Sequence, residues 1–329
     1  MQVQINLQLL PTLMFVCKTW VIVSVGFTIH DERKYKLIKK NIFERTKDSD
    51  NWIISNSSYE ELRSLDEIRA KVNYERVQDV LYCLDVLKRH VSPSNLKTIY
   101  KNLSNLSVER NPSILKLGYD GQYFTFFNKI VLGAENALPH EFIHASSSAY
   151  NHQKGIGYSG FVQYDSNKDI KICEGLNEGY TELLTARWFF NGVVKSNHNL
   201  VRIVELFEFF FDNPKDMETY YFNHNLPGFI KYMEQFSSKK EIIEILSLID
   251  AIRKGEKIPS LIKFFDEAKI LLKLYRMYQL HCQDPFKLKL FEEKIKQFPL
   301  ARLALAGQKL KLFRDYSYGK MHNEEQKRR

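Results

Sequence analysis

The chain has 329 residues, of which 44% are hydrophobic and 13% aromatic, and its 48 basic and 39 acidic residues give a net charge of +9. This composition excludes a largely disordered protein, because it supplies enough apolar side chains for a sizeable core. The four cysteines include no Cys-x-x-Cys pair, which excludes a small disulfide framework and favours free thiols in a reducing compartment.

The basic residues are scattered along the chain and interleaved with acidic ones, and only residues 326–329 form a basic cluster. A nucleic-acid-binding domain typically carries a compact basic stripe with aromatic residues that stack on bases. We therefore interpret the charge as a lysine-rich surface and expect no nucleic-acid partner. The sequence carries no signal for an oligomeric state.

The apolar stretch at residues 9–29 is open to two interpretations. It is long enough to cross a bilayer, although Lys18 near its middle would cost about 2.5–3.5 kcal/mol there. The alternation of residues 3–7 and the β-branched run 21–23 favour a pair of buried strands instead. A membrane anchor would leave the rest of the chain in the cytoplasm, because the basic run 33–40 follows the stretch and nothing positive precedes it. We therefore expect a cytoplasmic body, with or without an anchor.

The first predicted elements are helices, followed by strands. Residues 58–108 show the apolar period of helices, with a break at a proline. The period then shortens, so that 114–119 and 122–127 look extended, joined by an Asp-Gly turn. Residues 129–133 add a further strand.

Two more helices are expected around a glycine-rich stretch. The first covers about 136–150, and the second covers about 175–190. Between them, 161–164 and 170–172 are predicted to pair as a hairpin. From residue 191 onwards the pattern is almost entirely helical.

This order of elements predicts an α+β fold with a small, mostly antiparallel sheet. We divide the chain into three parts: an apolar N-terminal segment at 1–30, a unit of helices, small sheet and motif helices at 31–190, and a helical lobe at 191–329.

The first motif helix carries the pattern His-Glu-x-x-His at His140, Glu141 and His144. Histidines four residues apart project from one face of a helix, so both imidazoles can reach a single ion. Glu141 lies about 100° further round, where it can address a metal-bound water without binding the metal. The pattern therefore predicts a catalytic zinc site.

Such a site needs a third protein ligand and an open fourth position. The second motif helix offers Glu178 and Glu182, again one turn apart on one face. One carboxylate can bind the ion, and the other can accept a hydrogen bond from a ligand imidazole. Glu174 is a rival third ligand, but it lies near the helix start, where acidic residues are common.

The pattern Asn177-Glu178-x-x-x-Glu182 resembles the second signature of the gluzincins, the thermolysin-like metallopeptidases, which is usually Asn-Glu-x-x-x-Asp. The resemblance covers residues 129–187 and identifies no family within that superfamily. It implies a zincin-like catalytic unit with Zn²⁺ on His140, His144 and Glu178, and with Glu182 as the partner of His140. The chain departs from the signature in ending it with Glu and in a longer gap between the two motifs than in thermolysin.

The expected function is hydrolysis of a peptide or protein substrate, in which Glu141 would act as the general base on a metal-activated water.

 The metal and this base together define a zinc metallopeptidase, most simply an endopeptidase. Two alternatives are a zinc hydrolase of a non-peptide amide and a non-catalytic basic interaction protein.

The resemblance also implies a Tyr or His that stabilises the oxyanion. The candidates are Tyr158, Tyr164, Tyr180 and His152, and we select Tyr158 because it lies in the glycine-rich stretch, whereas Tyr180 should point away from the metal. An edge strand within 123–132 would lie above the motif helix and receive an extended peptide by main-chain hydrogen bonds.

Overall fold

The computed structural model describes residues 77–103, 106–151, 155–165, 170–254, 260–299 and 302. The predictions for segment 1–30, for the basic cluster 326–329 and for His152 fall outside these residues, and the proposed division of the chain stays a prediction. No helix in the described ranges is long and apolar enough to span a membrane.

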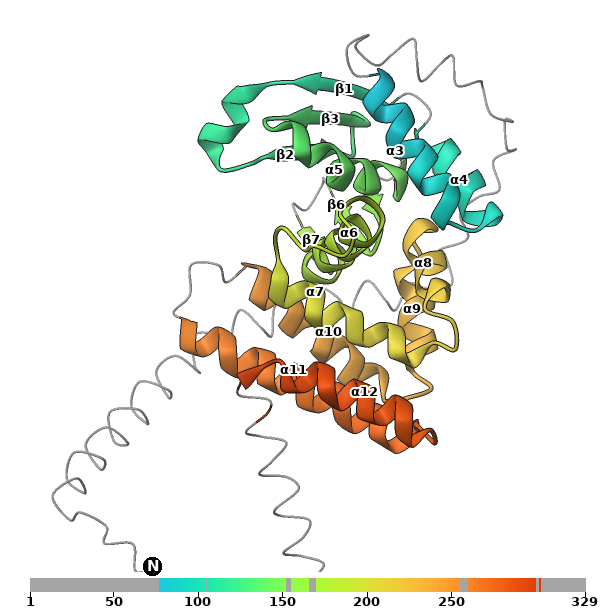
Figure 1. Ribbon diagram of the computed structural model, residues 1–329, viewed down its shortest axis with the longest axis vertical. Coiled ribbons are helices and arrows are strands. Elements are labelled where there is room, and N and C mark those ends of the chain that lie inside the picture. Colours follow the sequence, from blue (N-terminus) through green and yellow to red (C-terminus); the bar gives the residue numbers. More distant parts are fainter. Residues whose placement is uncertain are drawn as a thin grey trace, which may run out of the picture.

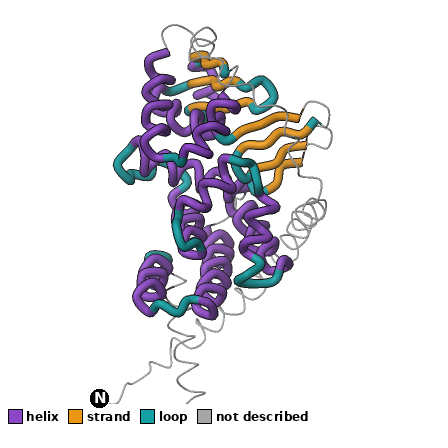
Figure 2. Tube along the Cα trace, turned by 90° about the vertical axis from the view of Figure 1, so that its right-hand side faces the viewer, coloured by secondary structure: helices purple, strands orange, loops and turns teal. Residues whose placement is uncertain are grey.

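The protein has an α+β fold in which helices predominate (Figures 1 and 2). The first half of the described chain contains helices α3 (Val77–His90), α4 (Pro93–Leu103) and α5 (Leu138–Ser146) and strands β1 (Ser107–Arg110), β2 (Gly121–Phe124) and β3 (Lys129–Leu132). Strands β4 (Ser148–Asn151), β5 (Ile156–Ser159), β6 (Val162–Asp165) and β7 (Ile170–Ile172) lead to helix α6 (Glu174–Phe189). The helices that follow are α7 (His198–Glu205), α8 (Lys215–Phe222), α9 (Leu226–Met233), α10 (Lys239–Lys254), α11 (Ser260–His281) and α12 (Pro285–Lys296).

The three-stranded sheet has the order β1-β3-β2, with β1 parallel and β2 antiparallel to β3. Strand β2 is therefore an edge strand, and it packs beside α5. The prediction of an edge strand within 123–132 is confirmed for β2. It is wrong for β3, which lies in the middle of the sheet because it pairs with β1 on one side and with β2 on the other. The sequence missed β1, because Ser107–Arg110 contains only one apolar residue, Val108, and so shows no alternating pattern.

Residues 114–119, predicted as extended, instead lie largely in a 3₁₀ helix, η4 (Pro112–Leu117). The Asn111 side chain accepts a hydrogen bond from the Ser113 N–H at its start, and Gly118 ends it with a φ of +83°. These capping residues bound a short helical turn. They decide the conformation more strongly than the apolar alternation does.

The four-stranded sheet is an antiparallel meander, β4-β5-β6-β7, between α5 and α6. The predicted hairpin is confirmed as β6 and β7, whereas β4 and β5 were not predicted. Helix α5 ends at Ser146 and not at 150. The Ser146 hydroxyl donates to the Phe142 carbonyl (2.7 Å) and the Ser147 hydroxyl to that of His144 (3.2 Å). Serine side chains that bond local carbonyls in this way compete with helix continuation.

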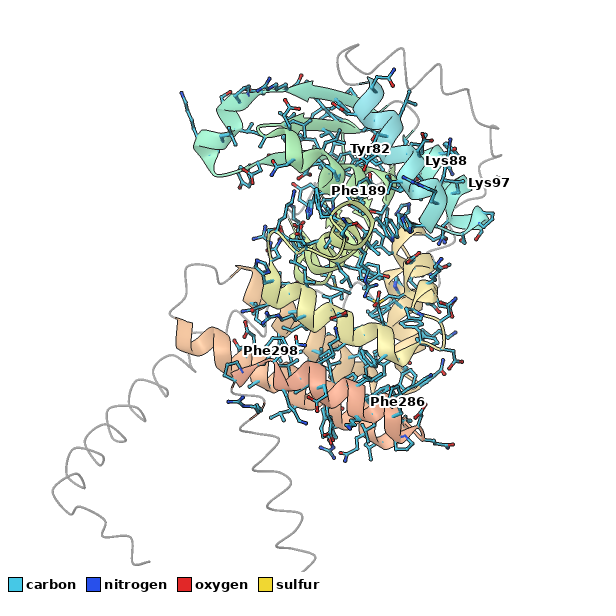
Figure 3. All side chains as sticks on the ribbon, viewed as in Figure 1. Tyr82, Lys88, Lys97, Phe189, Phe286 and Phe298 are labelled. Atoms are coloured by element: carbon cyan, nitrogen blue, oxygen red, sulfur yellow. The ribbon has the colours of Figure 1, made fainter. Side chains whose placement is uncertain are left out.

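Helix α6 lies at the centre of the molecule, between α5 on one side and α7 and α10 on the other (Figure 1). Its first turn is capped by Asp250 of α10, whose carboxylate accepts the N–H groups of Cys173 (2.7 Å) and Gly175 (2.8 Å). Near its other end, the Phe189 ring meets that of Tyr82 on α3 edge-on at 6.3 Å (Figure 3). The helical lobe therefore fixes α6 in position beneath α5.

Arg187 near the end of α6 lies close to two acidic side chains, Glu208 and Glu218. Arg187 makes two hydrogen bonds to Glu208, at 2.7 and 2.6 Å. Glu218 on α8 is only 6% exposed, and its Oε2 has no hydrogen-bond partner among the described residues. Burial, together with the charge of Glu208, raises the pKa of Glu218 to about 7.

Glu218→Gln is expected to stabilise the protein at neutral and alkaline pH. A carboxyl group whose pKa is raised in the folded state destabilises that state increasingly as pH rises from about 4.5 to about 7, because the unfolded chain gives up the proton first. The difference in unfolding free energy between variant and wild type should therefore grow by about 1–3 kcal/mol between pH 5 and pH 8. Urea unfolding at both pH values measures it, with the exposed Glu234→Gln as control. An equal difference at the two pH values would contradict the prediction.

Candidate metal centre

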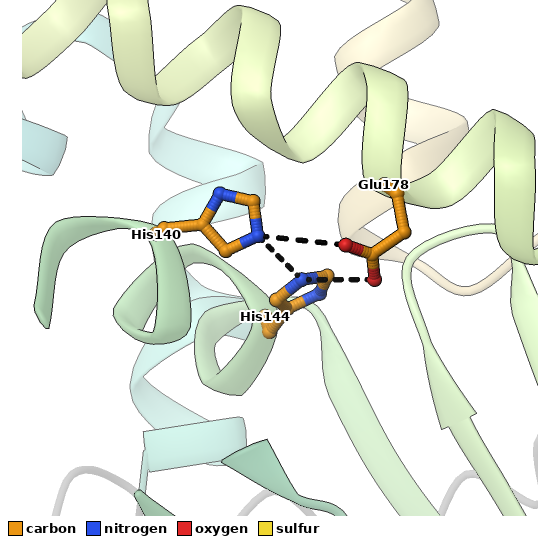
Figure 4. A group of neighbouring side chains, drawn as sticks. All are labelled: His140, His144 and Glu178. Atoms are coloured by element: carbon orange, nitrogen blue, oxygen red, sulfur yellow. Dashed lines mark hydrogen bonds and ion pairs between the residues drawn. The ribbon is translucent and has the colours of Figure 1, made fainter. Parts of the chain in front are cut away.

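Helices α5 and α6 bring three donor side chains together (Figure 4). The Nε2 atoms of His140 and His144, one turn apart on α5, lie 3.1 Å from each other. The Glu178 carboxylate on α6 faces them, with one oxygen 3.7 Å from His140 Nε2 and the other 3.4 Å from His144 Nε2. The three ligand atoms lie within 4.8 Å of one another, and they form the one such group found in the part of the chain that the structure describes.

These separations fit a tetrahedral metal site. Ligand atoms about 2.0–2.2 Å from a Zn²⁺ ion are about 3.3–3.6 Å apart when the angles are tetrahedral. The 3.1 Å between the two imidazole nitrogens and the 3.4 Å from His144 Nε2 to one Glu178 oxygen lie near this value, and the other oxygen lies 3.7 Å from His140 Nε2. Two imidazoles and one carboxylate would occupy three corners of such a site and leave a fourth for a water molecule.

Glu182 contacts the His140 ring on the side away from the other two donors. Its Oε2 lies 3.0 Å from His140 Nδ1, while its Oε1 accepts the backbone N–H groups of Lys195 (2.8 Å) and Ser196 (3.0 Å). An Nδ1–H that donates to Glu182 leaves His140 Nε2 free to bind a metal. The loop between α6 and α7 thus holds the Glu182 carboxylate in contact with His140.

The second histidine is surrounded by polar side chains on its Nδ1 side. Ser159 Oγ and Thr181 Oγ1 both lie 3.4 Å from this nitrogen, and Asn177 Nδ2 lies 3.3 Å from it. The two hydroxyl oxygens are the atoms that can accept its proton, since an amide NH₂ is only a donor. Asn177 also accepts the Phe161 N–H at 3.0 Å, so it joins the β5–β6 turn to α6.

Glu141 lies next to the three donors without being one of them. Its side chain is buried, and the backbone N–H of Tyr123 on β2 donates to its carboxylate. Burial raises the pKa of Glu141 to about 7; His140 opposes this shift, and the charge of Glu178 adds to it. A carboxylate with a pKa near neutrality can both take up and release a proton.

The charges of the three donors suit a cation. Burial opposes ionisation of Glu178, but the two histidines outweigh it and lower its pKa to about 2. Burial also lowers the pKa of His144, to about 4, so its imidazole stays neutral. Hydrogen bonds to Glu178 and Glu182 overcome the effect of burial at His140 and raise its pKa to about 10. Two carboxylates therefore converge on one imidazole, which is an environment that favours positive charge.

The remaining predicted residues lie elsewhere. Glu174 is outside the group of three and pairs with Lys171 at 3.8 Å. Tyr158 lies in β5 one residue before Ser159, so the two side chains point to opposite faces of the strand. Its ring lies 6.2 Å from that of His224, and its role as an oxyanion donor stays a prediction.

The other two tyrosines are also placed. Tyr180 is buried against Phe161 and Tyr221, and its predicted direction away from the metal ligands stays a prediction. Tyr164 meets Phe126 edge-on at 5.0 Å.

Sequence reasoning missed the hydroxyl groups around His144. Thr181 stands one turn after Asn177 and would be found by extending the face of the second motif helix. Ser159 offers no such signal, because only the folding of the sheet that contains β5 brings it to His144. Comparison of the chain with protein-family models, curated proteins and solved structures found no match.

Gly160→Ala is expected to destabilise this arrangement. Gly160 has a φ of +54°, and a Cβ there would lie 2.2 Å from Tyr221 Cε2 and 2.3 Å from Asn177 Oδ1. Overpacking and the left-handed backbone together should cost about 2 kcal/mol or more. Denaturant unfolding measures this cost. Gly192→Ala is the matched control, since its φ is +83° but nothing lies within 4 Å. Equal losses in both variants would show that backbone strain alone is responsible.

Proposed function

We propose that the protein is a zinc-dependent peptidase of the gluzincin type, in which His140, His144 and Glu178 hold the metal. The convergence of these three donors, with Glu141 buried beside them, is the observation that carries the proposal. Two histidines and one glutamate, with a fourth position open, are a ligand set of catalytic zinc sites. The helix pair beneath a small sheet with a free edge supports a zincin-like catalytic unit.

The chemistry divides between the ion and the protein. Bound zinc lowers the pKa of its water to near 7 and polarises the substrate carbonyl. Glu141 takes the proton of the attacking water and delivers it to the leaving amine. Glu182 keeps the His140 ring oriented, and the hydroxyls of Ser159 and Thr181 orient His144.

Strand β2 is the proposed binding edge for the substrate. In an antiparallel pair of strands, hydrogen-bonded residue pairs alternate with pairs that are not hydrogen-bonded. The Gly133 N–H donates to the Asp120 carbonyl, so the next pair, Gly121↔Leu132, and the pair Tyr123↔Ile130 are not hydrogen-bonded pairs. The main-chain groups of Gly121 and the Tyr123 carbonyl therefore face the open edge, and the Tyr123 N–H on the same edge donates to Glu141. An extended peptide can add there as a further strand.

A reducing compartment remains part of the proposal. Cys83 and Cys173 are buried, Cys282 is partly exposed, and none of the three takes part in a disulfide among the described residues. Burial raises the pKa of the Cys83 thiol to about 12, so it is unreactive. We therefore propose a cytoplasmic enzyme whose thiols stay reduced.

The purified protein is expected to contain about one zinc per chain. His144→Ala and Glu178→Ala should lose most of this metal, because each removes one of three ligands. Glu182→Ala should weaken zinc binding by about 10–100-fold through loss of the contact to His140. Metal analysis after dialysis against a mild chelator measures these effects, with Glu174→Ala as control. Full zinc content in Glu178→Ala, or its loss in Glu174→Ala, would contradict the assigned ligand set.

Glu141→Gln is expected to keep the zinc and to lower peptide cleavage by at least about 10²-fold, because the amide cannot accept the proton of water. Cleavage of a peptide library, read by mass spectrometry, provides the measurement. Persistent cleavage in the variant would show that Glu141 is not the base. A zinc-loaded wild type that cleaves no peptide would instead favour hydrolysis of a non-peptide amide.

A further inference from the structure

The contact between strand β2 and the proposed base is unusually close. A Cβ at Gly121 would lie 2.8 Å from Glu141 Cγ and 3.2 Å from its Oε1. It would also lie 2.8 Å from the Cβ of Ala137, just before α5. Ordinary contacts between carbon atoms are about 3.5–4.0 Å, so no side chain fits here without movement of the strand or of Glu141.

The next residue on the same face of β2 also acts on Glu141. The Tyr123 N–H donates to the Glu141 carboxylate. The Tyr123 hydroxyl in turn donates to Asn128 Oδ1 at 3.0 Å and bonds the hydroxyl of Ser148, which begins β4 just after α5. Strand β2 is thereby tied to the chain at the end of α5, so its height above the motif helix is set by these contacts.

We propose that Gly121 is a positioning residue for Glu141, an inference that rests on the proposed function. Because Gly121 has no side chain, the Glu141 carboxylate can lie beside the open edge of β2. The Tyr123 N–H donates to the carboxylate and keeps it in this position. The same edge is the proposed site of the peptide backbone. The base, its hydrogen-bond donor and the substrate are then aligned by one strand, and a methyl group at residue 121 would displace the base from this alignment.

Gly121→Ala tests the positioning role through kinetics. A displacement of about 1 Å in a catalytic group can cost about 10²-fold in rate, so kcat should fall by about that factor. KM and zinc content should stay within about twofold of wild type. Gln122→Ala is the matched control, because its side chain projects from the opposite face of the strand. An unchanged kcat in Gly121→Ala, or an equal loss in Gln122→Ala, would overturn the proposal.

A thermal unfolding cycle tests the contact without any need for activity. Gly121→Ala should lower the Tm of the wild-type chain by several degrees, and this loss should be clearly smaller in the Glu141→Ala background, where the crowded carboxylate is absent. An equal loss in both backgrounds would show that the methyl group disturbs the strand and not Glu141, and would overturn the proposal. A wild type that binds zinc but cleaves nothing would remove the kinetic role, whereas the unfolding cycle would still report the contact.

Discussion

The close approach of α5 and α6 is the constraint on which the site depends. Two imidazoles on one helix and a carboxylate on another converge so that their donor atoms lie within 4.8 Å of one another, which is the condition for the proposed metal site. The contact between His140 and Glu182 fixes this approach, because the same carboxylate also binds the backbone of the loop after α6. One side chain thus orients a ligand and secures the loop that follows its own helix. Loss of either contact would loosen the relation between the two helices.

The helical lobe supports the site from below. Asp250 of α10 caps α6 at the turn that precedes Glu178, so a helix far along the chain sets the position of the third ligand. The buried aromatic rings of Tyr180, Phe161 and Tyr221 pack against one another at α6. The strands also contribute contacts to the site: Ser159 of β5 contacts His144, and β2 contacts Glu141. The ligands are therefore held by rigid elements and not by loops, which is what a preorganised site requires.

The secondary structure of the motif region could be predicted only where the local pattern was long. Helix α6 and the β6–β7 hairpin were predicted correctly, because each has a clear period. Strands β1, β4 and β5 were missed, since their sequences, Ser-Val-Glu-Arg, Ser-Ala-Tyr-Asn and Ile-Gly-Tyr-Ser, are rich in small and polar residues that do not favour strands. The 3₁₀ helix at Pro112–Leu117 was mistaken for a strand because its caps, and not its apolar residues, determine its conformation.

The sequence by itself determined which side chains share a helix face: His140 with His144, and Glu178 with Glu182. Spacings of four residues are enough for this, since the geometry of a helix is local. Only the tertiary structure decided how far apart the two faces lie, which hydroxyls reach His144, and that Gly121 lies against Glu141. These contacts join residues that are distant in the chain, and they depend on the packing of the helices, the meander and the edge strand around one another.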